Sequence, residues 1–174
     1  MGTHDLKDKP MISTEQLFLK MALDAWRTQI DRTTKLIDSL SDEQLQREVA
    51  PGRNTGVYLL GHLAAVHDAL ISLMRFGERL YPELDKTFVG NPDGAGLSKP
   101  PVSELRLAWT RVNEKLSEHF DTLTEKEWFE RHAAISEADF NKEPHRNRLN
   151  VVLNRTSHLA NHLGQLTFLK PREQ

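Results

Sequence analysis

Hydrophobic residues recur every three or four positions over four long stretches of the chain, which is the spacing of one face of an α-helix. These stretches cover residues 13–39, 55–80, 101–122 and 147–169. Polar segments or punctuating glycines and prolines separate them, and none alternates as a strand would. The pattern therefore predicts an all-α fold, a four-helix bundle with one long crossover connection.

The apolar positions also predict which face of each helix is buried. In the first helix the expected core face is Leu17, Met21, Ala25, Trp26, Ile30, Thr33 and Ile37. In the third helix it is Leu105, Trp109, Val112, Leu116 and Phe120. The second helix is largely apolar, apart from a polar stripe of Asp68, Ser72, Arg75 and Arg79.

Helix starts are marked by Ser or Thr followed three positions later by Gln or Glu, the spacing of a capping box. The pairs are Ser13 with Gln16, Ser41 with Gln44, and Thr124 with Glu127. The first pair opens the first long helix. The other two predict short helices inside residues 41–48 and 124–131.

The connections suggest one domain. Residues 1–12 are a polar stretch expected to form a flexible leader, and residues 13–170 are expected to form a single bundle domain. Residues 82–101, rich in Gly and Pro, form the long crossover. A loop of this length in a compact domain usually has a function or is part of an interface. Residues 131–146 read as a polar connector.

Composition narrows the possible functions. The net charge of −2 offers no basic field for nucleic acid, and the absence of cysteine excludes disulfides, thiolate zinc sites and a cysteine nucleophile. No secretory signal is visible, and no apolar run is expected to span a membrane. We therefore expect a cytoplasmic protein that binds neither nucleic acid nor membrane.

The candidate chemistry lies in the last helix, where His158 and His162 are four residues apart. Residues at this spacing differ by about 40° in direction, so both rings can lean toward one point, as in zinc-binding HExxH helices. The pair lies on the seam between the apolar and polar sides of the helix. Two histidines whose ring nitrogens are hydrogen-bonded at a helix–helix boundary would show the same spacing. The sequence of this helix alone favours that interpretation over a metal site.

A catalytic metal usually takes a third protein ligand. In "LLGHLAAVHDAL" the second helix offers His62 and His67. Both fall within its apolar arc, toward opposite edges, and periodicity does not choose between them. Either imidazole would be costly to bury unless it is hydrogen-bonded or metal-bound.

Two segments carry a resemblance to a known family. "GRNTGVYLLGHLAAVHD" and "EPHRNRLNVVLNRTSHLANHLGQLTFLK" resemble the DinB/YfiT-like superfamily, four-helix bundles with a histidine in "LGHL" and a final helix reading HxxxHxGQL. The resemblance extends over nearly the whole chain. It implies that His62, His158 and His162 bind a metal, and that His67 is structural or exposed.

The implied ligand set favours a divalent transition metal. Three imidazoles leave coordination positions open and suit zinc, nickel, iron or copper, with zinc and nickel first, rather than calcium or magnesium. Asn161 and Gln165 are candidates to accept the other N–H of a ligating histidine. Arg155, one turn before His158, is a candidate to hold a substrate anion, although it also reads as an ordinary solvated arginine.

Characterised relatives include enzymes that use low-molecular-weight thiols, thiol S-transferases and a thiol-dependent isomerase among them. The resemblance therefore implies a metal-dependent transfer of such a thiol to an electrophilic small molecule. A metal-dependent hydrolase is the neighbouring alternative. A stress-associated, non-catalytic homodimer with a structural metal is the alternative from another class, and a homodimer is expected in either case.

Overall fold

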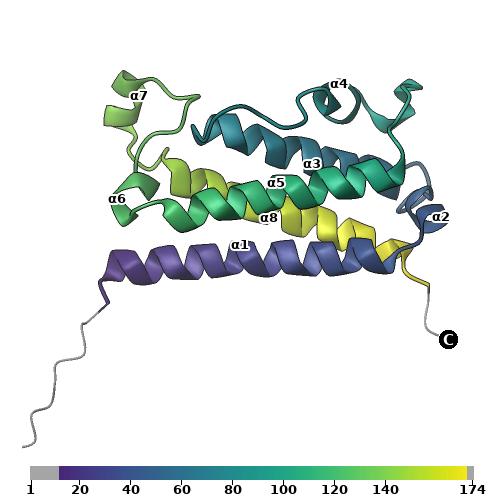
Figure 1. Cartoon of the computed structure of the whole chain (residues 1–174), viewed down its shortest axis with the longest axis horizontal. Coiled ribbons are helices and arrows are strands. Elements are labelled where there is room, and N and C mark those ends of the chain that lie inside the picture. The colour runs from purple at the N-terminus through teal and green to yellow at the C-terminus, as the bar shows by residue number, and fades with distance from the viewer. Residues whose placement is uncertain (1–11, 172–174) are drawn as a thin grey trace, which may run out of the picture.

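Four long helices form the body of the protein in the computed structural model, which describes residues 12–171 (Figure 1). The order is α1 Thr14–Ser39, α2 Asp42–Leu45, α3 Gly56–Leu73, α4 Leu84–Phe88, η1 Asp93–Ala95, α5 Val102–Thr122, α6 Glu125–Trp128, α7 Glu137–Lys142, α8 Arg148–Leu166 and η2 Thr167–Leu169. No strand occurs between residues 12 and 171, so the prediction of an all-α fold is confirmed. The expected leader lies outside the described residues, except for its last position.

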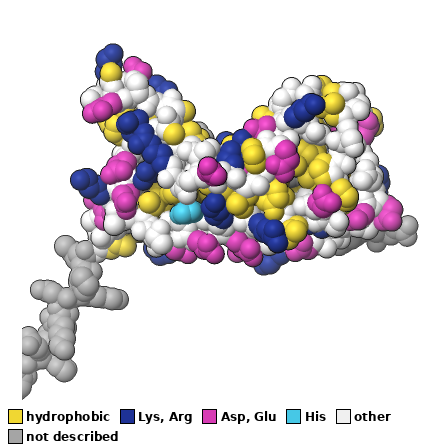
Figure 2. Space-filling model, turned by 45° about the horizontal axis from the view of Figure 1, so that its top comes forward, with side chains coloured by type: hydrophobic (Ala, Val, Ile, Leu, Met, Phe, Trp, Pro, Cys, Tyr) yellow, Lys and Arg dark blue, Asp and Glu magenta, His cyan; other side chains and the backbone are white. Residues whose placement is uncertain are grey.

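The long helices pack as two pairs. Helix α1 runs along α8, and α3 runs along α5, while α3 also meets α8 across the bundle. The connection from α3 to α5 carries α4, which packs against α3 on the upper side of the view in Figure 1. In Figure 2 the ends of this face are raised and a lower strip lies between them, where hydrophobic, acidic and basic side chains are interspersed.

Two hydrophobic clusters fill the bundle. One surrounds the first half of α3 and includes Leu59, Leu63, Phe88 and Leu159, all buried. The other lies toward the opposite end and includes Trp26. All five apolar positions predicted for the third helix are buried, which confirms that face of α5. Because the first cluster encloses the meeting point of α3 and α8, side chains placed there are held by packing.

The predicted helix starts are confirmed. In each capping box the hydroxyl accepts from the backbone N–H three residues later, and the Gln or Glu side chain accepts from the backbone N–H of the cap. These boxes open α1, α2 and α6. Helix α7, by contrast, lies in the connector that sequence periodicity left without structure.

The second long helix ends at Leu73, earlier than the predicted residue 80. Arg75 adopts a left-handed φ of 64°. Phe76 N–H then donates to Ile71 O at 2.8 Å, and Arg75 N–H donates to Ser72 O at 3.1 Å, the two bonds of a Schellman motif. Glycine usually occupies this position, and an arginine there gives the sequence no stop signal.

Asp68, the first residue of the polar stripe in the second helix, does not lie at the surface. Its side chain is fully buried. It accepts from Arg79 Nε at 2.9 Å and from the backbone N–H groups of Leu80 and Tyr81 at 2.7 and 3.0 Å. Arg79 also contacts Asp85, so this network ties the segment after α3 back onto the helix.

The core face of α1 is also displaced in its first half. Leu17, Met21 and Ala25 were expected in the core and are exposed. Ala22 and Leu23 are buried in their place, beside Trp26, Thr33 and Ile37 as predicted. The periodicity was correctly read as helical, but two adjacent apolar stripes competed in this stretch and packing selected the other one.

The sequence expectation that no apolar run is long enough to span a membrane is wrong for one helix, judged by its length and composition alone. Residues Gly56–Leu73 are long and apolar enough to cross one, and 78% of this helix is buried inside the protein. A fully surrounded core helix has the same composition as a membrane span. The burial accounts for the hydrophobicity of α3 without a membrane.

Candidate metal centre

Three histidines from two helices converge where α3 faces α8. His62 lies on α3, and His158 and His162 lie one turn apart on α8. The Nε2 atom of His158 is 3.2 Å from Nε2 of His62 and 3.1 Å from Nε2 of His162. One ligand atom from each of the three lies within 4.8 Å of the others.

These separations suit a shared cation. Two imidazole nitrogens bound to zinc at about 2.0–2.1 Å are about 3.3 Å apart at a tetrahedral angle and about 2.9 Å apart at a right angle. The observed 3.1 and 3.2 Å fall between these values. His158 therefore stands at the spacing of a metal ligand from each of the other two histidines.

Two of the rings are oriented by their other nitrogen. His62 Nδ1 donates to the backbone carbonyl of Phe88 at 2.8 Å, and His162 Nδ1 donates to Gln165 Oε1 at 2.8 Å. In a neutral imidazole a protonated Nδ1 leaves a lone pair on Nε2. Both Nε2 lone pairs thus face the common centre, as metal ligation requires.

His158 is the one ring of the three whose Nδ1 is not held by a hydrogen bond to any residue that the structure describes. Its Nδ1 is buried and has no hydrogen-bond partner among residues 12–171. Its Nε2 can carry one proton and so can donate to only one of the two facing lone pairs. At least one of the two facing lone pairs then has no hydrogen-bond donor. A divalent cation at the centre accepts all three, so these residues fit a transition metal.

Burial keeps His62 and His158 unprotonated. Desolvation lowers the pKa of His62 below its ordinary value. Desolvation, and then the charges of His162, Arg155 and His62, lower the pKa of His158 to about 4. Imidazole must be neutral to bind a metal, so both rings are ready to do so at neutral pH.

A model of the DinB superfamily matches residues 25–166 of the chain, most of its length. The chain belongs to the DinB superfamily. DinB proteins are generally metal-binding, in keeping with the histidine cluster of this member. No curated protein matches the sequence.

A solved structure shares the fold of this DinB protein. It is the conserved protein from Enterococcus faecalis, with a TM-score of 0.57 and 14% sequence identity. The alignment covers 86% of this chain and 93% of the other. At this identity the likeness supports the arrangement of helices alone.

The fourth histidine considered from the sequence, His67, lies outside the DinB cluster. It is fully buried, and its ring lies 5.0 Å from the rings of both Trp26 and Trp109. Its Nδ1 is 2.9 Å from Asn113 Oδ1. Desolvation lowers its pKa to about 3. The structure therefore gives His67 a place in the core, and the choice between His62 and His67 follows from the direction of each ring.

Of the two residues predicted to orient a ligating histidine, Gln165 does so in the structure and Asn161 does not. Gln165 holds His162, whereas Asn161 is exposed and makes no hydrogen bond to a clustered histidine within the described part of the chain. Arg155 is partly buried near the cluster. The carbonyl of Phe88, which holds His62, has no counterpart in the sequence prediction, because a backbone acceptor at the end of α4, 26 positions away, leaves no residue-type signal.

The contact between Phe88 and α3 depends on Gly61. A Cβ atom at Gly61 would lie 2.3 Å from Cε1 of Phe88, far inside van der Waals contact. The missing side chain lets the buried Phe88 ring lie against the helix, and the Tyr58 ring packs against it at 5.8 Å between ring centroids. The Phe88 carbonyl thereby reaches His62.

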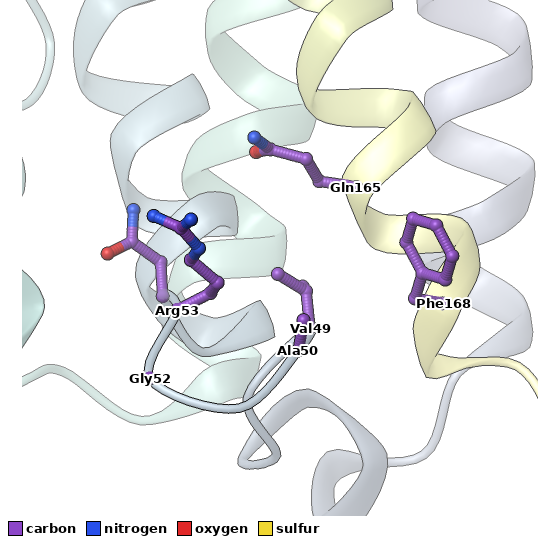
Figure 3. Close-up of a pocket in the computed structure, with 7 residues that line it drawn as sticks. Val49, Ala50, Gly52, Arg53, Gln165 and Phe168 are labelled. Carbon is purple, nitrogen blue, oxygen red and sulfur yellow. The ribbon is translucent and has the colours of Figure 1, made fainter.

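A hollow of about 470 Å³ lies next to Gln165, and none of the three histidines is among its lining residues. Its lining residues are Val49, Ala50, Gly52, Arg53, Asn54, Gln165 and Phe168. In Figure 3 Arg53 and Gln165 extend into the same space from the α2–α3 connection and from α8. Gln165 thus borders the hollow and holds a cluster histidine, and the volume is in the range of small-molecule sites.

Proposed function

We propose that this DinB protein is a metal-dependent enzyme that transfers a low-molecular-weight thiol to an electrophilic small molecule. The observation that supports the proposal is the convergence of three imidazole Nε2 atoms without a fourth ligand group from residues 12–171. A divalent transition metal held there, zinc or nickel first, would have open positions and would lower the pKa of a bound thiol.

The residues of the chain supply orientation and a fixed protonation state. Phe88 and Gln165 hold two of the rings, and burial keeps His62 and His158 neutral. The chain contains no cysteine, so a sulfur nucleophile has to come from a separate molecule.

The proposed transfer needs no oxidant or reductant besides the thiol and its acceptor. The sulfur forms a bond to an electrophilic carbon of the acceptor, and the thiol proton passes to solvent. In a substitution the leaving group departs with its bonding electron pair. In an addition the displaced pair takes up a proton from solvent.

The alternatives differ from thiol transfer in different ways. Hydrolysis by activated water would use the same open positions, and the absence of a carboxylate among the groups that perturb the pKa of His62 and His158 weighs on both reactions alike. A purely structural metal in a non-catalytic dimer would favour four protein ligands and a closed shell. The cluster offers three.

Cobalt substitution tests the proposal. Cobalt-loaded protein is titrated with glutathione, bacillithiol and mycothiol while absorption is followed in the near ultraviolet. We expect a sulfur-to-cobalt charge-transfer band that saturates near one thiol per chain. His158→Ala should abolish cobalt binding, and His145→Ala, an exposed histidine outside the cluster, should leave it intact. A loaded protein whose spectrum none of the thiols changes would refute thiol chemistry.

A further inference from the structure

Arg155 differs from the other arginines that are withdrawn from solvent. Within residues 12–171 the remaining partly or fully buried arginines all bind a carboxylate or a backbone carbonyl: Arg79, Arg106, Arg131, Arg146 and Arg148. Arg155 is partly buried too, yet no described residue forms an ion pair or a side-chain hydrogen bond with it. A desolvated cation without a partner is unfavourable, so its retention suggests a ligand.

The guanidinium group of Arg155 is open to such a ligand. Its nitrogens make no hydrogen bond, but they are not among the solvent-inaccessible polar atoms that lack a partner. Solvent therefore reaches at least part of the group. It lies one helical turn before His158, and its charge lowers the pKa of His62, His67 and His158, which places it beside the centre.

The charge balance of this region identifies the sign of the ligand. Three neutral imidazoles, one divalent metal and one guanidinium carry a formal charge of about +3 together. The charged groups that act on His62, His67 and His158 are other histidines and Arg155, and none is acidic. A thiolate alone would neutralise a single positive charge, so a second anionic group is favoured.

We propose that Arg155 binds a carboxylate group of the molecule that occupies the open side of the metal centre. This inference rests on the proposed function and specifies its substrate class as acidic. Guanidinium binds carboxylate through two parallel N–H···O bonds, a geometry that an amide of the same shape does not reproduce. The carboxylate belongs either to the thiol or to its acceptor, and the two sources are separable by experiment.

The thiol arm compares 3-mercaptopropionate with 3-mercaptopropionamide on cobalt-loaded protein. We expect the wild type to bind the acid about 10- to 100-fold more tightly than the amide, the range of a charge-assisted hydrogen bond. Arg155→Gln should bind both equally, and its affinity for the amide should match that of the wild type. Arg32→Gln removes the same charge from an exposed position on α1 and should retain the preference.

The second arm needs no thiol chemistry. Malonate should raise the unfolding temperature of zinc-loaded wild type and of Arg32→Gln, and should leave that of Arg155→Gln unchanged. Malonamide should affect none of them. If malonate acts through Arg155 while neither thiol gives a cobalt band, the thiol function fails and the carboxylate site stands, with the carboxylate on another substrate.

If Arg155 instead stabilised the fold, its replacement would lower the unfolding temperature of the protein even without metal or ligand. Arg155→Met removes an unpaired charge and keeps most of the apolar stem, so the metal-free variant should unfold at a temperature no lower than that of the wild type. A clear drop in that temperature, or equal carboxylate preference in wild type and Arg155→Gln, would overturn the inference. A cobalt–thiolate band with no acid preference would leave the thiol function intact.

Discussion

Replacing Gly61 with alanine should damage the metal centre through packing alone. The added Cβ would lie 2.3 Å from Cε1 of Phe88 and 2.5 Å from two further ring atoms. The Phe88 ring is fully buried, so it has no free direction in which to move. Its displacement shifts the backbone carbonyl that accepts from His62 Nδ1 at 2.8 Å.

Two effects of opposite sign set the change in stability. Overfilling a packed core costs about 1–3 kcal/mol, and alanine in place of glycine within a helix recovers about 1 kcal/mol. We therefore expect Gly61→Ala to lower the free energy of unfolding of the metal-free protein by up to about 2 kcal/mol. Loss of the carbonyl that orients His62 should weaken metal binding about 10- to 100-fold.

Gly164→Ala is the matched control. Gly164 lies in α8, two residues after His162, and a Cβ there meets no atom within 4 Å. This variant should gain up to about 1 kcal/mol of stability and bind metal like the wild type. Urea denaturation measures stability, and zinc competition with a chromophoric chelator measures affinity.

If Gly61→Ala and Gly164→Ala bind zinc equally tightly, then the Phe88 carbonyl does not set the orientation of His62. A Phe88→Leu change in the Gly61→Ala background provides a second check. The smaller side chain leaves room for the Cβ, so part of the lost affinity should return, and a non-additive cycle would show the coupling.

Three further predictions concern stability. Arg75→Gly should raise the free energy of unfolding by about 1 kcal/mol in urea denaturation, because glycine adopts the φ of 64° without strain; an unchanged midpoint would contradict this. Asp68→Ala should cost about 2–3 kcal/mol, since it leaves the backbone N–H groups of Leu80 and Tyr81 without their acceptor while Arg79 keeps its pair with Asp85, and a loss below 1 kcal/mol would count against the network. His67 has a pKa of about 3 when folded, so the unfolded chain alone takes up its proton below pH 6.5, and its contribution is complete above that pH and declines as pH falls toward 3. The loss of stability between pH 7 and pH 5 should therefore be about 2 kcal/mol smaller in His67→Gln than in wild type, and equal losses would refute the assignment.

The sequence predicted the fold through local signals that packing did not override. Capping boxes such as Ser13 with Gln16 marked helix starts, and the period of α5 placed its core face. The stop of α3 was missed because Arg75 takes the conformation that glycine normally marks. The burial of Asp68 was missed for a different reason: its partner Arg79 lies beyond the helix, where periodicity carries no information.

The site was predictable only in part for similar reasons. The spacing of His158 and His162 gave a pair on one helical face, and that is a local property. Whether His62 or His67 joins them depends on the rotation of α3 against α8, which residue types alone do not fix. The resemblance chose His62, and the structure places its Nε2 3.2 Å from that of His158. The Phe88 carbonyl is a tertiary contact without a sequence signature.

X-ray absorption at the metal edge of zinc-loaded protein tests the three-histidine centre most directly. The account predicts one zinc per chain with three imidazole nitrogens at about 2.0–2.1 Å and at least one non-protein light-atom ligand, and one imidazole fewer in His62→Ala. A spectrum with four protein ligands, or one that His62→Ala leaves unchanged, would contradict it.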